Sequence, residues 1–429
     1  MGRDGHSPVR HRQNQLGRRD LSVFAWLDHS EQERRRMLEL VGLFREQGTV
    51  DELGIGTIRD ALADTLFPGT STLHTRPGYL LFIPWIYQRI ERDRVPSARA
   101  AERLKRDELR LIEALAAGGE REGVIGIEAR TRLQRFPSVV YWNALATLGI
   151  RRFPGSQQQY HRALDSIHRR RSQSVRDDEG EDLALAHTWH RRLPDPPAGL
   201  LEQVSFALGH EDADYLRDRI LESSPATFLA HLVASEGDQL DGDFPWDCLL
   251  ADSAPVEVRG HLEHARNFSE LLHGAMLLYN LILAEKVNEA RRAGAEADVE
   301  SDLTSHYRGL LEQWAATVGA RRDAYRAWSR PGFWDLVTRR DTRVSMRTRT
   351  FVARWVDLAA ERPVEVADDP AARELVAGRE VAVKRQLARV ANPRALERWS
   401  GAAGTTQLSF RWKESRQVAT DVLAGLKEG

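Results

Sequence analysis

Apolar residues recur along this chain mostly at intervals of three and four positions, the spacing that places them on one face of a helix. Ser30 and Glu33 form a capping box before one such stretch, in which Met37, Val41 and Phe44 share a face. Further helices are predicted over residues 98–117, 139–148, 157–171, 212–221, 225–235, 256–293, 303–316, 320–328, 351–360, 371–390 and 413–426.

Strand patterns are nearly absent from the sequence. Only residues 407–412 look like a strand, as an isolated extended segment. No segment repeats at a fixed period, so a solenoid is not expected. The pattern therefore predicts an all-α fold, built as a multi-helix array.

A small helix-turn-helix or winged unit is one interpretation of residues 126–152 in the N-terminal half. It would have a helix over 127–135, a turn at 136–138 and a second helix ending at Gly149, with Arg151 and Arg152 placed to contact phosphates. The alternative is a purely structural hairpin, in which residues from the second helix form core: Tyr141, Trp142 and Leu145.

The stretch DELGIGTIRDALADTLFPGTS, residues 51–71, carries two glycines close together and then a Pro-Gly turn. Gly54 and Gly56 have neither the third glycine nor the preceding apolar strand of a dinucleotide site, and no phosphate-loop lysine follows. We expect a helix over 55–66 instead, followed by a turn at Pro68 and Gly69.

A chain of 429 residues is long for one hydrophobic core, and its size favours more than one domain. A polar stretch at 172–182 is the best linker. The sequence thus predicts a disordered basic tail over 1–20, an N-terminal helical domain over 21–171, that linker, and a C-terminal helical domain over 183–429.

Composition indicates a globular protein, with 41% hydrophobic and 29% charged residues. The one cysteine, Cys248, excludes an internal disulfide. The first twenty residues are polar and arginine-rich, without the apolar run of a secretory signal, and no apolar stretch has the length of a membrane helix. We expect a cytoplasmic protein without membrane contact.

The formal net charge of −1 hides a strong segregation of charge. Residues 121–171 hold ten arginines against three acids, whereas residues 177–247 hold seventeen acids against four arginines. Two more basic blocks lie at 339–354 and 379–416. These blocks could dock on acidic segments within the fold, bind a protein partner, or converge on a surface for polyanions.

Nucleic acid, most simply DNA, is the polyanion that such blocks favour. The arginines predicted to contact it are Arg130, Arg132, Arg151, Arg152, Arg169, Arg170, Arg171, Arg347 and Arg349. Aromatic residues lie among the second and third blocks and would suit stacking on unpaired bases, although core burial is their ordinary fate.

Two groups of residues could instead hold a metal ion. Asp60 and Asp64 lie one helical turn apart, and Glu270 and His273 have the spacing found in carboxylate-bridged di-iron bundles. No second Glu-x-x-His motif occurs, so a satisfied polar stripe between helices explains Glu270 and His273 better. We expect no cofactor and no metal.

Several motifs resemble those of a bacterial family of unknown function. They are residues 26–30 (WLDHS), 49–60 (TVDELGIGTIRD), 66–71 (LFPGTS) and 81–85 (LFIPW). Shorter matches include Thr75-Arg76, Pro137-Ser138, Tyr279-Asn280 and Phe410-Arg411-Trp412. The family resembles accessory proteins encoded near helicases and nucleases of bacterial genome defence. Arg59, Asp60 and Arg76 are motif residues of unknown role.

Together these observations predict a non-enzymatic nucleic-acid-binding or adaptor protein of a genome-defence (anti-phage) or DNA-processing system. Its partner would be nucleic acid or a protein such as a helicase or nuclease. The alternatives are a metal-dependent hydrolase or nuclease, and a structural subunit that binds only proteins.

Overall fold

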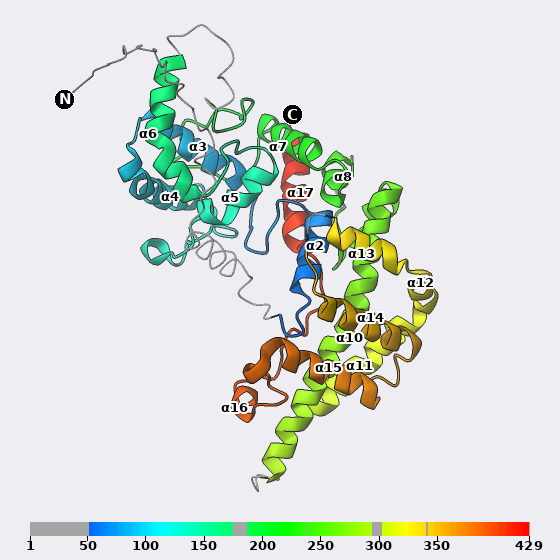
Figure 1. Cartoon of the computed structure of the whole chain (residues 1–429). Coiled ribbons are helices and arrows are strands. Elements are labelled where there is room, and N and C mark those ends of the chain that lie inside the picture. Colours follow the sequence, from blue (N-terminus) through cyan, green and yellow to red (C-terminus); the bar gives the residue numbers. More distant parts are fainter. Residues whose placement is uncertain (1–50, 175–186, 238, 294–302, 340–341, 429) are drawn as a thin grey trace, which may run out of the picture. The chain divides into compact units, whose positions relative to one another are not determined.

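Helices dominate the computed structural model, which describes residues 51–174, 187–237, 239–293, 303–339 and 342–428 (Figure 1). Within these ranges the chain forms sixteen α-helices and no β-strand. The predicted all-α class is therefore confirmed. The predicted basic tail, the helix after Ser30 and most of the polar linker lie outside the described residues.

One group of helices packs around α3 (Tyr79–Arg92). It contains α4 (Ala100–Ala117), α5 (Pro137–Thr147) and α6 (Gln157–Ser174). Eleven of the fourteen residues of α3 are buried, so this helix is the core of the group. Tyr141, Trp142 and Leu145 of α5 are also buried, as the structural-hairpin interpretation predicted.

The helix-turn-helix unit is not confirmed. Where a helix was predicted over 127–135, the chain forms only the 3₁₀ turn η2 (Arg130–Arg132). Gly126 has a φ of +88°, and a Cβ atom there would lie 2.6 Å from a Leu133 methyl group. The backbone thus turns sharply where a helix would need to run straight.

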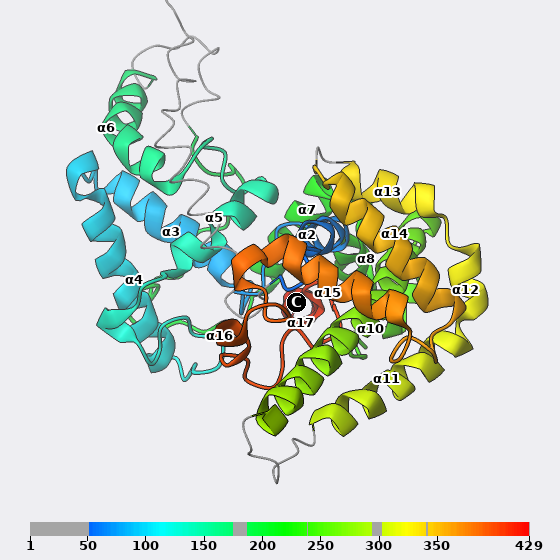
Figure 2. The same cartoon turned by 60° about the horizontal axis from the view of Figure 1, so that its bottom comes forward.

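A second group of helices surrounds the 38-residue helix α10 (Val256–Ala293), whose predicted bounds are confirmed. Its neighbours are α11 (Leu303–Ala320), α14 (Met346–Glu361) and α15 (Pro370–Lys384). Figures 1 and 2 both show α11 running beside α10. A Cβ atom on Gly274 would lie 2.2 Å from the Trp314 ring, so glycine is what lets α11 approach this closely.

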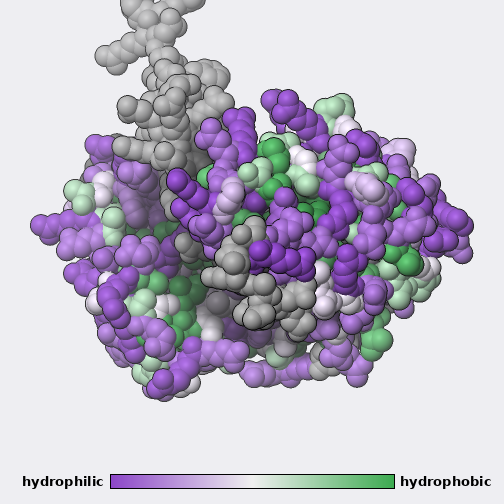
Figure 3. All heavy atoms as spheres, turned by 90° about the horizontal axis from the view of Figure 1, so that it is seen from below, coloured by the Kyte–Doolittle hydropathy of each residue, from purple (hydrophilic) through white to green (hydrophobic). Residues whose placement is uncertain are grey.

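The remaining helices link these groups. They are α2 (Gly56–Leu66), α7 (His210–Ser223), α8 (Phe228–Ala234), α9 (Leu250–Ser253), α12 (Arg322–Ala327), α13 (Arg330–Thr338), α16 (Pro393–Leu396) and α17 (Trp412–Lys427). Residues 50–429 form one compact unit, and one continuous apolar core runs through it. On the face shown in Figure 3 the surface is mostly hydrophilic, with hydrophobic residues in small groups.

Residues 407–412, predicted as a strand, form no strand, and that prediction is wrong. The segment is a connector whose groups bond to helices: the Ser269 hydroxyl donates to the Leu408 carbonyl at 2.7 Å. Phe410 and Arg411 have φ angles of +53° and +66°, which turn the chain into α17 and break any extended run. Alternating side chains here reflect a connector with one buried side.

Several residues of the short motifs make long-range polar contacts. The Arg76 guanidinium donates twice to Asp421 of α17, at 2.7 and 3.2 Å. The Tyr141 hydroxyl accepts from the Thr75 amide at 2.8 Å and donates to the Arg76 carbonyl at 3.0 Å. Arg411 donates to Asp64 at 2.6 Å and to the Thr70 carbonyl at 2.9 Å. These residues tie the ends of the described unit together.

The opening of the DELGIG stretch is held by α15 and by its own aspartate. Asp51 accepts from the Ile55 and Gly56 amides, and so caps the start of α2. Arg379 donates to the Leu53 and Gly54 carbonyls at 2.7 and 3.0 Å. The predicted helix and turn are thus present, and Arg59 pairs with its neighbour Asp60.

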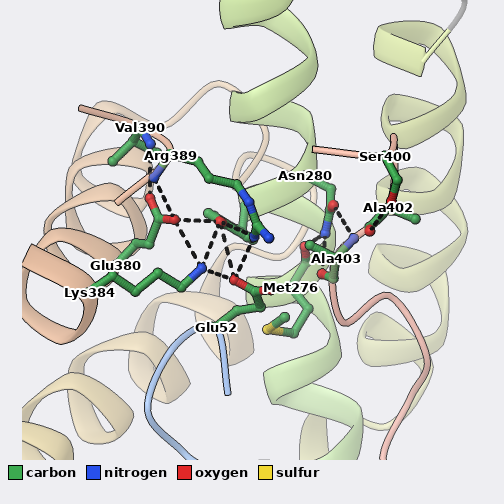
Figure 4. A network of polar contacts seen from close by, with 11 residues as sticks. Glu52, Met276, Asn280, Glu380, Lys384, Arg389, Val390, Ser400, Ala402 and Ala403 are labelled. Atoms are coloured by element: carbon green, nitrogen blue, oxygen red, sulfur yellow. Dashed lines mark hydrogen bonds and ion pairs between the residues drawn. The ribbon is translucent and has the colours of Figure 1, made fainter. Parts of the chain in front are cut away.

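A buried ionic cluster joins Glu52 to α10 and to the end of α15 (Figure 4). Glu380, which has no exposed surface, accepts from the Tyr279 hydroxyl at 2.5 Å and from Lys384 at 3.1 Å. Glu52 accepts from Lys384 and from Arg389. Two buried carboxylates thus balance two partly buried cations.

Replacing Glu380 with alanine should lower the free energy of unfolding by about 3–5 kcal/mol, because it leaves the partly buried Lys384 and Arg389 with one carboxylate between them. Urea denaturation followed by circular dichroism measures this change. Asp323→Ala is the control, since Asp323 is fully exposed in its pair with Arg326 and should change little. Equal midpoints for Glu380→Ala and the unmodified protein would contradict the assigned role.

Candidate functional site

One pocket among the described residues has a volume of about 660 Å³. Its walls come from α3, from the end of α6, and from residues 187–200. The charged residues that line it are Arg89, Glu91, Arg92, Arg171, His187, His190, Arg191 and Asp195. We call this the cationic pocket.

Two backbone hydrogen bonds and one side-chain hydrogen bond position the segment over residues 187–200. The Arg152 amide donates to the Thr188 carbonyl at 2.9 Å, and the His190 amide donates to the Ile150 carbonyl at 2.8 Å. The Trp85 indole of α3 donates to the Pro194 carbonyl at 2.7 Å. The pocket is therefore built by segments about 100 residues apart in the sequence.

A buried carboxylate, Glu91, lies at the base of the pocket with 4% of its surface exposed. It accepts hydrogen bonds from the hydroxyls of Tyr160 and Thr188, and it pairs with Arg171 at 2.7 Å. Burial raises the pKa of Tyr160 well above its usual range, so the phenol keeps its proton and donates. Arg171 on α6 is thereby held against α3.

The arginines make the interior of the pocket electropositive. Burial, and to a smaller extent the charges of Arg219, Arg152 and Arg192, lower the pKa of His190 to about 4. Burial and the charges of Arg191, Arg171 and Arg152 likewise lower the pKa of His187. Both imidazoles are therefore neutral at pH 7, and the positive charge comes from guanidinium groups.

Two buried polar atoms at the pocket have no hydrogen-bond partner within the described ranges. They are Nε of Arg89 and Nδ1 of His190. Buried groups of this kind are rare in folded proteins, because each one loses its bonds to water without replacement. The Arg89 Nε atom can only donate, so its position beside the pocket indicates a place where an acceptor is needed.

The predicted nucleic-acid contacts are only partly brought together here. Arg171 lines the pocket, Arg152 lies close enough to influence His187 and His190, and Arg169 and Arg170 are exposed on the same helix as Arg171. Arg130 and Arg132 are exposed on η2. Arg347 and Arg349 lie on α14, where the Arg349 guanidinium is 5.1 Å from the centre of the Trp334 ring.

Arg151 is 8% exposed, and its side chain is committed to the fold. Its guanidinium donates to the carbonyls of Trp142, Phe153 and Gly155 and lies 4.4 Å from the centre of the Trp142 ring. Burial lowers its pKa to about 10, so it still carries its charge at pH 7. We therefore leave Arg151 out of the candidate surface.

Many other charges of the predicted blocks pair locally or inside the fold. In the acidic segment, Arg192 pairs with Asp218 and Glu222, and Arg217 pairs with Asp214. In the third basic block, Lys384 and Arg389 pair with Glu52 in the ionic cluster, and Arg411 pairs with Asp64. Charge counts along the sequence thus overstate the charge left for a ligand.

The residues considered for a metal site are engaged by arginines. Asp60 pairs with Arg59, and Asp64 with Arg411. Glu270 is bound by Arg266, Arg321 and the Tyr325 hydroxyl, while His273 Nε2 lies 3.0 Å from the Thr405 carbonyl. No group of three or more His, Cys, Asp or Glu side chains with metal-binding geometry occurs among the residues with described positions.

Sequence reasoning missed most of the cationic pocket. Arg89 and Arg92 lie outside every basic block, and Arg191 falls in the segment counted as acidic. A local signal was present, because His187, His190, Arg191 and Arg192 cluster within six residues that also carry Trp189. The many acidic residues around this cluster made the segment count as acidic, so the cluster was not recognised.

The chain belongs to a family of unknown function, DUF6361, whose model matches residues 21–425. The predicted resemblance to a family of unknown function is confirmed at that level. No curated protein matches the chain, and no solved structure does. In the part of the chain with described coordinates, each helix is too short or too polar to span a membrane.

His190 should titrate at about pH 4, far below the usual histidine value of 6.5, because it is buried beside three arginines. Between these two values the unfolded chain binds a proton that the folded protein does not, so the stability contributed by neutral His190 falls as the pH drops through this window. NMR titration of ¹³C-labelled histidine, assigned with His190→Gln, measures the pKa. A value near 6.5 would contradict the burial of the His190 side chain.

Proposed function

We propose that this protein is a non-enzymatic nucleic-acid-binding or adaptor protein, and that the cationic pocket with the exposed end of α6 contacts the phosphates. The observation that carries the proposal is the gathering of Arg89, Arg92, Arg171 and Arg191 on one pocket from three chain segments. Guanidinium groups bind phosphate oxygens through paired hydrogen bonds as well as through charge.

The surroundings of the pocket extend its positive charge. Arg152 adds a positive charge from residues 150–153, and Arg169 and Arg170 add two more from α6. All three side chains are exposed. Such a group would neutralise several neighbouring phosphates and release their counterions, which is the main source of affinity for a nucleic-acid backbone. Arg130, Arg132, Arg347 and Arg349 remain proposed additional contacts.

The biological setting follows from the resemblance. Proteins encoded beside genome-defence helicases and nucleases act on DNA or on the enzymes that do, so the proposed setting is bacterial genome defence or DNA processing. In that setting the acidic residues of the 187–247 region that remain exposed, such as Asp195, Glu202 and Glu211, supply a surface for a protein partner.

Replacing Arg169 and Arg170 together with alanine should weaken binding to duplex DNA and reduce the slope of log affinity against log salt by about 2, because each phosphate contact contributes about 1 to that slope. Fluorescence anisotropy with labelled duplex DNA, single-stranded DNA and RNA across a salt series measures both quantities. The substituted side chains are exposed, so the fold should be unchanged.

Arg326→Ala is the matched control, because Arg326 is an exposed arginine of α12 outside the pocket and outside the three basic blocks. It should leave both affinity and slope as they are. If the double variant and the control behave alike, α6 does not contact nucleic acid. If the unmodified protein binds no nucleic acid even at low salt, the proposed function is wrong.

A further inference from the structure

The cationic pocket is a recess whose back wall is almost fully buried. Trp85, Thr188 and Trp189 line it with 2–3% of their surfaces exposed, and Glu91 lies beside them. Its volume of about 660 Å³ is in the range of small-molecule sites in proteins, roughly 300–1,000 Å³. A groove that only followed a continuous nucleic-acid backbone would need no such depth.

The donors in this recess outnumber the acceptors that the described residues supply. The Arg171 charge is balanced by Glu91 at 2.7 Å, and Asp195 is the other acid of the lining. Arg92 pairs with Asp93 at 3.9 Å, and Arg89 and Arg191 remain as further cations. Within the described residues, the Arg89 Nε and His190 Nδ1 atoms are buried without a hydrogen-bond partner. His190 is 7% exposed, so its side chain belongs to the wall of the recess.

A terminal phosphate matches these donors better than a phosphate inside a chain. A phosphomonoester carries a charge of about −1.5 to −2 at pH 7 and has three terminal oxygens that accept hydrogen bonds. An internal phosphodiester has one charge and two such oxygens, and it is flanked on both sides by sugars. A terminal group can enter a recess end-on, whereas an internal phosphodiester must bring the chain on both sides along with it.

We propose that the cationic pocket binds a phosphomonoester group, carried either by the end of a nucleic-acid strand or by a free nucleotide. Arg89 and Arg191 hold the phosphate oxygens, while Arg171, fixed by Glu91, sets the base of the site. This inference rests on the function proposed above, since it assigns a ligand to the same pocket, but it is tested separately.

Competition binding distinguishes the two sources of the phosphate. Oligonucleotides of one sequence carry a 5′-phosphate, a 3′-phosphate or hydroxyls at both ends, and adenosine 5′-monophosphate and adenosine are the free probes. A phosphorylated end should bind about tenfold more tightly than the hydroxyl end, the effect of roughly one charge-assisted hydrogen bond. Isothermal calorimetry on the full-length protein measures each affinity.

The double variant Arg89→Ala/Arg191→Ala should lose this preference and keep residual binding to the hydroxyl-ended strand through α6. These two side chains form no ion pair in the described structure, so their removal should not unfold the protein; circular dichroism checks this. Arg326→Ala again serves as control and should keep the full preference. Arg89→Lys/Arg191→Lys should restore part of it through charge alone.

Each outcome decides the inference. Preference for a phosphorylated strand or for adenosine 5′-monophosphate, lost in the double variant, supports it. Salt-dependent binding of all strands without any preference for a phosphate overturns it and leaves the proposed function standing. Binding of adenosine 5′-monophosphate without binding of any strand supports it and overturns the proposed function. A preference that persists in the double variant places the phosphate elsewhere and overturns it.

Discussion

Buried carboxylates are the constraint around which this helical fold is arranged. Removing a charge from water costs several kcal/mol per ion, so each such group must find donors among its neighbours. Three glutamates meet this need in the same way: each accepts a hydrogen bond from a buried tyrosine and pairs with at least one cation. The pairs are Glu91 with Tyr160, Glu270 with Tyr325, and Glu380 with Tyr279. Burial raises the pKa of all three phenols, which keeps them as donors.

What distinguishes the cationic pocket from the other two sites is the balance of charge around the glutamate. At Glu380, Lys384 and Arg389 are matched by Glu52, and the cluster closes on itself. At Glu270, Arg266 and Arg321 share one carboxylate within the helical group around α10. At Glu91, Arg171 is matched but Arg89, Arg92 and Arg191 also line the pocket. Among these three sites, the one at Glu91 brings the most arginines to a pocket.

The sequence was a good guide to helices and a poor guide to the site, for a physical reason. The long apolar face of α10 and the glycine stop after α4 act locally, so periodicity predicted these elements to within a few residues. The short helix α13 was missed, although Ser329 accepts from the Gly332 amide as an N-cap would. The pocket depends on α3 meeting residues 187–200, a contact that no local pattern encodes. Arg151 is the opposite case. It lies in a basic block of the sequence, but its guanidinium donates to backbone carbonyls inside the fold.

The ion pair between Arg76 and Asp421 joins two residues that lie 345 positions apart in the sequence. Because a chain is synthesised from its N-terminus, the helices around α3 emerge from the ribosome long before α17 exists. Until then Arg76 lacks its carboxylate, and Asp64 and the Thr70 carbonyl lack Arg411. The earliest part of the unit thus stays incomplete until the last helix arrives, so a fragment shortened by even that one helix forfeits contacts near its beginning. These contacts near Arg76 can form only after α17 has been synthesised.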